Sequence, residues 1–262
     1  MTYRAKVIVI TGASGGLGTA LASEFAEPGH TLLLQGRDAI RLADARQKAE
    51  ALGARVETLR LDLRDTEALN EALRDFDARH PIDLLIANAG VKTGNLGGSE
   101  NPDQLKRVLD VNLTSTIHTV QAILPAMLSR KAGRIAIVSS LAALSPHADL
   151  LSYTATKAGL YAYATALRRA LNGTGVTVTS VIPGFIDTPM TDRQNGPAPM
   201  LMSPEKAARL IAKGLMNGKP CIAFPKLLVA LAWLAERLPA PIADRIVERY
   251  RARILPDRDE AP

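Results

Sequence analysis

A tyrosine and a lysine four residues apart, Tyr153 and Lys157, are the pair of side chains in this sequence that most suggests chemistry. One turn of helix would place both on the same face. A nearby ammonium stabilises a phenolate, so we expect Lys157 to lower the pKa of Tyr153 from its ordinary value of about 10 toward neutrality. A phenol tuned in this way can transfer a proton to or from the oxygen of an alcohol or a ketone.

Two further polar residues precede this pair along the chain. Ser140 lies thirteen residues before Tyr153, at the end of a predicted strand, where its hydroxyl can hydrogen-bond a substrate oxygen on which charge develops. Asn112 lies in a long helical zone and could hold a water for proton relay. Each residue alone has a simpler interpretation, as a surface pair on a helix, the start of a loop, or an asparagine that bonds the backbone. Their occurrence together, in this order, favours a catalytic group.

A glycine-rich turn lies near the start of the chain, between a predicted strand and a predicted helix. It reads Thr-Gly-Ala-Ser-Gly-Gly-Leu-Gly over residues 11–18. Glycines let the backbone approach a pyrophosphate closely, and the N-terminus of the following helix offers free N–H groups and a positive dipole end. The alternative is simply a tight turn, and a kinase-type P-loop is disfavoured because no Gly-Lys-Ser/Thr ends it. The residues expected to meet the phosphates are Gly12, Ser14, Gly16, Leu17 and Gly18.

The end of the second predicted strand indicates which dinucleotide would bind. An acidic residue there would accept hydrogen bonds from the ribose 2′-hydroxyl, but the chain has Gly36 followed by Arg37. A guanidinium at this position can bind a 2′-phosphate and stack on the adenine. The sequence therefore favours NADP(H) over NAD(H). The alternative is that Arg37 is only a surface charge beside Asp38 at the start of the next helix.

The composition limits the class of protein. Of 262 residues, 47% are hydrophobic, so the chain can build a core, and the formal net charge is +6. Basic residues alternate with acidic ones and only 4% are aromatic, so we expect no nucleic-acid surface. A single cysteine excludes an intramolecular disulfide. His118 and His147 lack further ligands at the spacing of a metal site, so we expect no metal site. The absence of a signal segment and of a long apolar run predicts a cytoplasmic protein.

Short apolar runs alternate with longer stretches of helical periodicity, which predicts one doubly wound α/β domain around a parallel sheet. The predicted strands are Val7–Ile10, Thr31–Leu34, Val56–Leu61, Ile82–Ala87, Arg134–Ser139, Val176–Ile182 and Cys221–Phe224. The predicted helices are Gly16–Ala26, Ala39–Leu52, Thr66–Ala78, a long zone over Pro102–Lys131, Tyr153–Leu171 and Ser203–Met216, with Ser203 as its N-cap. The loop from Asp187 to Met202 is weakly patterned and long enough to be a functional lid.

The chain resembles the short-chain dehydrogenase/reductase family from about Lys6 to Phe224. The motifs that carry the resemblance are residues 11–18, Asp62-Leu63, Asn88-Ala89-Gly90, Asn112, Ser140, Tyr153 with Lys157, and Pro183-Gly184. The resemblance implies a Rossmann fold, a three-layer sandwich with seven parallel strands, and a catalytic tetrad of Asn112, Ser140, Tyr153 and Lys157. It also implies homodimers or homotetramers.

The resemblance further implies roles for individual residues at a cofactor site. It places Asp62 near the adenine, Asn88 and Gly90 along the cofactor, and Lys157 on the nicotinamide ribose. It implies that Ile186 and Thr188 lie near the nicotinamide carboxamide. The remaining residues that it implies at the cofactor are Leu63, Ala89, Pro183 and Gly184. The chain departs from the family pattern in two places: Ala87 stands where the family usually has a second asparagine, and Gly15 stands where many NADP-preferring relatives have a basic residue. The preference for NADP(H) therefore rests on Arg37 alone.

The chain continues for 37 residues beyond Phe224 and Pro225. Leu227, Leu231, Leu234 and Leu238 recur at helical spacing, and a second stretch repeats Ile242, Ile246, Tyr250 and Ile254, so we expect two helices. They could pack on their own subunit, form a subunit interface, or meet a lipid surface. We also expect this segment and the 187–202 loop to wall an apolar substrate pocket.

Together these patterns predict a Rossmann NADP-binding catalytic domain over residues 1–225, with residues 226–262 as its C-terminal helical extension. The expected activity is the NADP(H)-dependent interconversion of a small-molecule secondary alcohol and a ketone, with an apolar substrate. The alternative is a non-catalytic protein of the same fold that senses NADP(H) or binds a partner. The presence of all four tetrad positions favours the enzyme, because a sensor has no need of them.

Overall fold

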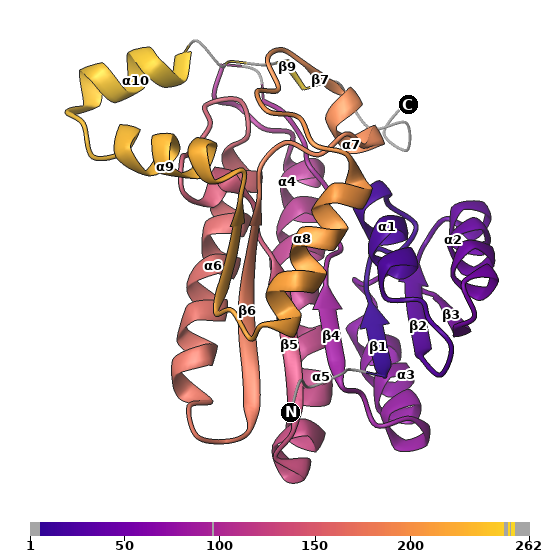
Figure 1. The fold of residues 1–262 in the computed structure, drawn as a ribbon. Helices are drawn as coiled ribbons and strands as arrows, with labels where there is room; N and C mark the ends of the chain where they lie inside the picture. The colour runs from indigo at the N-terminus through magenta and orange to yellow at the C-terminus, as the bar shows by residue number, and fades with distance from the viewer. Residues whose placement is uncertain (1–5, 96, 249–250, 252, 255–262) are drawn as a thin grey trace.

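A computed structural model of the chain shows a sheet of seven parallel strands in the order β3-β2-β1-β4-β5-β6-β8 (Figure 1). The structure describes residues 6–95, 97–248, 251 and 253–254. The strands are β1 (Val7–Ile10), β2 (Thr31–Gly36), β3 (Arg55–Arg60), β4 (Leu84–Ala87), β5 (Gly133–Val138), β6 (Val176–Pro183) and β8 (Cys221–Phe224). The predicted Rossmann-like α/β fold with a seven-stranded parallel sheet is therefore confirmed, and each predicted strand overlaps an observed one.

Helices cover both faces of the sheet and produce a three-layer sandwich. One face is covered by α1 (Gly16–Glu24), α2 (Ala39–Ala51) and α8 (Pro204–Met216). The other is covered by α3 (Thr66–Arg79), α5 (Ser115–Arg130) and α6 (Leu151–Ala170). Ser203 caps α8 as predicted, because its side chain accepts a hydrogen bond from the backbone N–H of Lys206.

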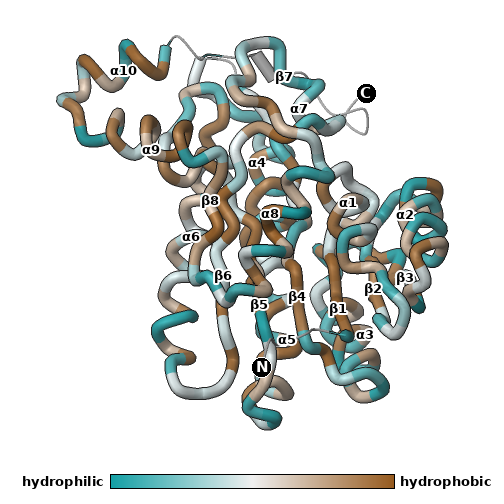
Figure 2. Tube along the Cα trace, in the orientation of Figure 1, coloured by the Kyte–Doolittle hydropathy of each residue, from teal (hydrophilic) through white to brown (hydrophobic). Residues whose placement is uncertain are grey.

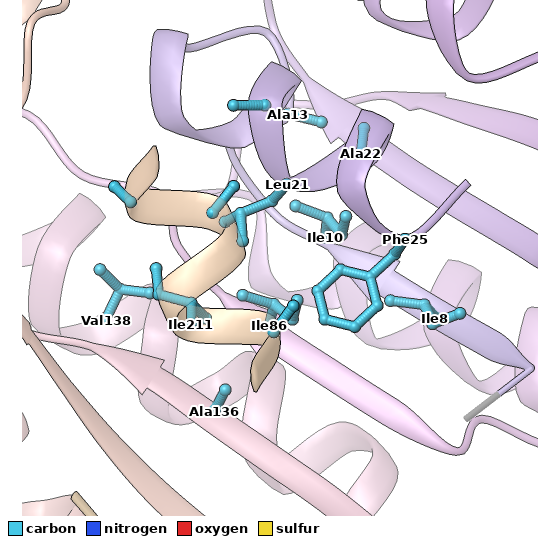
Figure 3. Packing of buried hydrophobic residues seen from close by; sticks show 14 of the residues in the cluster. Ile8, Ile10, Ala13, Leu21, Ala22, Phe25, Ile86, Ala136, Val138 and Ile211 are labelled. Carbon is cyan, nitrogen blue, oxygen red and sulfur yellow. The ribbon is translucent and has the colours of Figure 1, made fainter. Parts of the chain in front are cut away.

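Two hydrophobic clusters, one on each face, fill the space between helices and sheet. Successive residues of a strand point to opposite faces, so Ile8 and Ile10 of β1 enter one cluster while Val9 enters the other. Figure 3 shows Ile10 packed near Leu21 of α1 in the first cluster. Because both of their faces are buried, the central strands β1 and β4 are apolar along their whole length, as the brown tube of Figure 2 shows.

The order of the strands reverses at one point in the sheet, between β1 and β4. β1 pairs with β2 on one side and with β4 on the other, so the connections after β1 and after β4 leave toward opposite faces. In doubly wound sheets the crevice at the carboxyl ends of the strands beside such a point binds ligands. The glycine-rich turn and the segment 88–90 both start at this crevice.

The long helical zone predicted over Pro102–Lys131 contains a change of helix type. It consists of α4 (Pro102–Val108), a π-helical segment (Leu109–Thr114) and α5. The π-helical segment contains Asn112, which is fully buried. π-helical insertions occur frequently at functional sites.

The loop from Asp187 to Met202 carries more structure than its weak pattern predicts. It contains the short helix α7 (Pro189–Asp192) and the two-residue strand β7 (Gln194–Asn195). Residues Arg253–Ile254 form β9, which pairs antiparallel with β7. The prediction that the periodicity continues as a helix through Ile254 is therefore wrong.

After β8 the chain forms α9 (Lys226–Ala235) and α10 (Ala240–Glu248), which project from the body beside the carboxyl ends of the strands (Figure 1). Both predicted helices exist, although the second ends at Glu248 and Tyr250 lies outside the described residues. Large apolar side chains of both helices are exposed, among them Leu227, Leu231, Trp233, Leu234 and Ile242. Within the described part of the chain, no helix is long and apolar enough to span a membrane.

Candidate active site

The glycine-rich turn after β1 packs directly against the segment that follows β4. Gly12 has a φ of +66°, and a Cβ at this position would lie 2.7 Å from the Cα of Ala89. A Cβ on Gly18 would collide with the carbonyl oxygen of Gly12. Both positions therefore require glycine, the first for its backbone conformation and the second for the close approach of α1 to the turn. The structure brings Gly12, Gly18 and Ala89 together as the sequence predicts.

Hydrogen bonds from three side chains hold this turn in place. The Thr11 hydroxyl accepts hydrogen bonds from the backbone N–H groups of Asn88 and Ala89, at 3.1 and 3.2 Å. The Asn88 side-chain amide donates to the carbonyl oxygen of Thr11 at 3.1 Å. Gln35 accepts from the Gly12 N–H at 3.1 Å and donates to the carbonyl oxygen of Leu61 at 2.7 Å. Asn88 thus fixes the turn through the protein backbone.

Sequence reasoning did not identify Thr11 and Gln35 as supports of the turn. Both are buried polar residues, with 2% of each residue exposed. A polar side chain inside an otherwise apolar strand, such as Gln35 at the end of Leu-Leu-Leu, was the available signal, because a buried amide needs hydrogen-bond partners.

The structure fits a dinucleotide at this turn. The N-terminus of α1 has no side-chain cap, and its first turn contains no acidic residue. Its backbone N–H groups are therefore available to phosphate oxygens, and the positive end of the helix dipole faces the turn. Ser14 lies against the end of β2, with its hydroxyl oxygen 2.7 Å from where a Cβ on Gly36 would stand. Leu17, by contrast, packs against the first hydrophobic cluster.

Charged side chains gather where β2 and β3 end. A guanidinium nitrogen of Arg37 lies 4.0 Å from a carboxylate oxygen of Asp62, and Arg37 is 41% exposed at its side chain. Arg64 binds the same carboxylate through two nitrogens at 2.7–3.2 Å. The hydrogen bond from Arg64 is the main reason why the pKa of Asp62 is lowered. Asp62 therefore stays ionised between two arginines, while its neighbour Leu63 is buried in the second hydrophobic cluster.

Asp38 caps α2 through its own carboxylate, which accepts hydrogen bonds from the N–H groups of Ile40 and Arg41. This contact leaves Arg37 directed toward Asp62 rather than acting as the cap of the helix. The three residues Arg37, Asp62 and Leu63 lie at the β2–β3 end of the crevice. The predicted tetrad lies apart from them, on the π-helical segment, after the end of β5 and on α6. A ligand that touched both groups would have to be elongated, as a dinucleotide is.

The predicted catalytic residues come together beyond the end of β5. Ser140 lies close enough to Tyr153 for its side chain to lower the pKa of the phenol. The Lys157 Nζ lies 5.7 Å from the centre of the Tyr153 ring and donates a hydrogen bond to the carbonyl oxygen of Val138 at 3.0 Å. A Cβ on Gly90 would stand 3.3 Å from the same Nζ. The carboxyl ends of β4 and β5 and the first turns of α6 thus contribute to one site.

The electrostatics of this group differ from the expectation in one respect. Burial raises the pKa of Tyr153, and the hydrogen bond with Ser140 only partly offsets this effect. The expected lowering of the Tyr153 pKa by Lys157 is wrong for the protein alone. The physical reason is that Lys157 directs its ammonium to Val138 and is itself destabilised by burial, which lowers its pKa to about 8.

Asn112 is committed to holding the backbone beside the site. Its side-chain oxygen accepts from the Val91 N–H at 2.7 Å, and its side-chain nitrogen donates to the Val91 carbonyl at 2.9 Å. The same nitrogen also donates to the Thr156 hydroxyl at 3.2 Å. This pattern supports the simpler interpretation of the Asn112 side chain, as a link between the segment after β4 and α6. A water relay at Asn112 stays a prediction.

Ser139 is a further residue of the site that sequence reasoning treated only as a neighbour of Ser140. Its hydroxyl donates to the carbonyl oxygen of Lys157 at 2.7 Å, and the residue is 2% exposed. It therefore fixes the end of β5 against the middle of α6. Because α6 also carries Tyr153, this bond sets the distance between Ser140 and Tyr153.

The segment after β6 completes the wall above the turn. Pro183 ends β6, and the Gly184 N–H donates to the carbonyl oxygen of Phe224 at 2.8 Å. Ile186 is buried in the first hydrophobic cluster. Thr188 reaches the glycine-rich turn, since a Cβ on Gly16 would lie 2.7 Å from its methyl carbon. The structure therefore brings Thr188 to the phosphate end of the crevice.

Comparison with known proteins identifies the family. Residues 6–198 match the family model described as short chain dehydrogenase. The chain belongs to this family. An uncharacterized oxidoreductase of Myxococcus xanthus is 37% identical over 257 residues, which cover 96% of this chain and 99% of the relative.

Solved structures of short-chain dehydrogenases share the fold. The enzyme of Sphingobium yanoikuyae, in complex with NADPH, has a TM-score of 0.77 and 28% identity, over 94% of this chain and 96% of that one. That of Burkholderia phymatum, in complex with NAD, has a TM-score of 0.82 and 23% identity, over 95% and 97%. This short-chain dehydrogenase is therefore an oxidoreductase of a family that uses nicotinamide dinucleotides, and the fold alone does not select between the two.

Proposed function

We propose that this short-chain dehydrogenase interconverts a secondary alcohol and a ketone, with NADP(H) as its cofactor. The observation that carries the proposal is the gathering of Ser140, Tyr153 and the buried Lys157 ammonium, 5.7 Å from the Tyr153 ring centre, at the carboxyl end of the sheet. Two adjacent hydroxyls at one point can both hydrogen-bond a single carbonyl or alcohol oxygen.

The chemistry assigns a distinct task to each side chain. Ser140 donates a hydrogen bond to the carbonyl oxygen of the ketone and stabilises the charge that develops there. Tyr153 transfers its phenolic proton to that oxygen, and in the reverse direction it accepts the proton of the alcohol. Tyr153 is protonated at neutral pH, as its role as the acid in ketone reduction requires. When bound, the nicotinamide supplies or accepts the hydride.

Lys157 and Asn112 act on Tyr153 and on the surrounding backbone. In its protonated form Lys157 stabilises the phenolate that remains after proton transfer, because its Nζ lies 5.7 Å from the ring centre. It is also proposed to bind the nicotinamide ribose. Asn112 positions the segment 90–91 through Val91 and supports the return of a proton to Tyr153.

Tyr153→Phe tests the catalytic assignment. We expect the variant to lose at least about a thousandfold in kcat for ketone reduction, since it lacks the transferable proton, while its Kd for NADPH changes less than about threefold. The assay is NADPH oxidation at 340 nm across ketones that span sugars, steroids, quinones and 3-oxoacyl compounds. Tyr153→Phe activity close to that of the wild type would contradict the assignment.

The preference for NADP(H) is proposed from Arg37. Its guanidinium stands at the end of β2, more than a third exposed, where a 2′-phosphate would replace water beside it. We expect the ratio of kcat/KM for NADPH to that for NADH to exceed one, and to fall at least about tenfold in Arg37→Met. A matched control is Arg41→Met, which removes a cation that pairs with Asp38 on the same helix start. A wild-type ratio below one would refute the preference.

A further inference from the structure

We propose that Lys92, with Arg193 beside it, binds an anionic group of the substrate, a carboxylate or phosphate on the chain that bears the reacting carbonyl. The inference rests on the proposed function, because it concerns the substrate of the same site. It adds a charge to the apolar substrate expected above.

Lys92 is a buried cation with only a neutral partner among the described residues. The residue is 7% exposed, and its Nζ donates to the side-chain oxygen of Gln194 at 3.3 Å. No carboxylate within the described ranges forms an ion pair with it. Burying an ammonium is costly unless an anion or several hydrogen bonds compensate for the lost water. A buried ammonium with one amide contact is therefore suited to a negatively charged ligand.

Lys92 follows directly on the segment that borders the tetrad. Lys92 follows Val91, whose N–H and carbonyl both bond to Asn112. Gly90, two residues before Lys92, approaches the Nζ of Lys157. Two extended residues span about 7 Å, so the main chain carries Lys92 from the tetrad toward the 187–202 loop, where it meets Gln194.

Arg193 adds a second positive charge at the same place. It follows α7 and lies close enough to Lys92 to lower the pKa of that lysine, which burial and this repulsion together bring to about 8. The two cations come from segments about a hundred residues apart in the sequence, so the fold rather than local structure brings them together. The charge of Arg193 therefore adds to the positive potential at Lys92, which favours an anionic ligand there.

A purely structural role, as a link between Lys92 and the 187–202 loop, would need no charge. Lys92→Gln keeps a hydrogen-bond donor for Gln194 but removes the ammonium, whereas Lys92→Arg keeps the charge. These two variants therefore separate the link from the anion site. The affinity of each variant for NADP⁺ serves as the control for an intact fold.

The experiment measures binding rather than turnover. The NADP⁺ complex of the full chain, which cannot reduce a ketone, is titrated by calorimetry with 4-oxopentanoate, 6-oxoheptanoate and 8-oxononanoate, and with the methyl ester of each. A fourth titrant, 2-oxopropylphosphonate beside its dimethyl ester, distinguishes a phosphate-like group from a carboxylate. The three carbon chains allow for different separations between the carbonyl and the anion.

We expect at least one anionic ketone to bind wild type and Lys92→Arg about tenfold or more tightly than its ester, and this ratio to fall to within about twofold of one in Lys92→Gln. Absence of binding, equal binding of acid and ester, or an unchanged ratio in Lys92→Gln would overturn the proposal. Failure of the proposed oxidoreductase function would appear separately, as no NADPH oxidation with any of these ketones or esters. Binding and turnover thus test the two proposals independently.

Discussion

Replacing Lys92 by methionine should stabilise the folded protein at neutral pH. The pKa of Lys92 is lowered from 10.5 to about 8 by burial and, secondarily, by Arg193. The pKa thus falls by about 2.5, and each pKa unit corresponds to about 1.36 kcal/mol, so keeping the ammonium charged in the folded state costs about 3 kcal/mol. Methionine has a similar length and no charge, but it loses the hydrogen bond to Gln194, which is worth about 1 kcal/mol. The net gain in the free energy of unfolding is then about 2 kcal/mol at pH 7.

The effect should depend on pH in a defined direction. The folded pKa of Lys92 is lower than the unfolded one, so the unfolded chain binds more protons between these two values and wild-type stability rises with pH there. The cost is fully present below pH 8 and disappears as the pH approaches 10.5. The advantage of Lys92→Met should therefore shrink to below about 1 kcal/mol near pH 9.5.

Equilibrium unfolding in urea at pH 7 and pH 9.5 measures both quantities. Lys213→Met, at an exposed position of α8, is the matched control and should change stability by less than about 0.5 kcal/mol at either pH. A Lys92→Met variant that is less stable than wild type by the same amount at both pH values would refute the reasoning. Such a result would mean that the lysine gains more from its surroundings than burial costs it.

Two further predictions concern the crevice. Gly16→Ala should weaken NADPH binding about tenfold, because its Cβ would lie 2.7 Å from the methyl carbon of Thr188. Adding Thr188→Ser to the same chain removes that methyl and should restore much of the lost affinity. Equal affinities of the single and the double variant, measured by NADPH fluorescence titration, would contradict this contact. The kcat/KM for ketone reduction should fall as the pH rises through about 8, where Lys157 loses its stabilising charge, and Lys157→Arg should move that inflection to higher pH. A profile that is flat to pH 9.5 would show that the Lys157 charge is not needed.

Much of the fold follows from the sequence because the two periodicities are strong. Strands that are buried on both faces appear in the sequence as short apolar runs, and the helices between them each show one apolar stripe. The alternation of strands and helices, and most of their bounds, could therefore be predicted. The family resemblance supplied the number of strands. Where the prediction failed, near Ile254, the structure depends on pairing between β7 and β9, segments almost sixty residues apart. Local pattern contains no information about such a partner.

In the candidate site, too, the sequence predicted what depends on spacing along the chain but not what depends on tertiary contacts. Tyr153 and Lys157 could be placed on one face of a helix, and Gly12 and Gly18 in a turn, because their spacing determines these relations. The pKa values of Tyr153 and Lys157 could not be predicted in this way. They depend on burial and on the direction in which the Lys157 ammonium points, which Val138 decides from another strand.

The sequence by itself determined the class of fold, and it predicted the dinucleotide turn and, through the family resemblance, the residues of the tetrad, because these depend on residue type and on distances along the chain. Only the tertiary structure decided the supports of the turn at Thr11 and Gln35, the commitment of the Asn112 side chain to Val91, and the meeting of Lys92 with Gln194 and Arg193. The physical reason is that burial and long-range hydrogen bonds arise from contacts between distant segments, and these contacts set the charge state and orientation of each side chain.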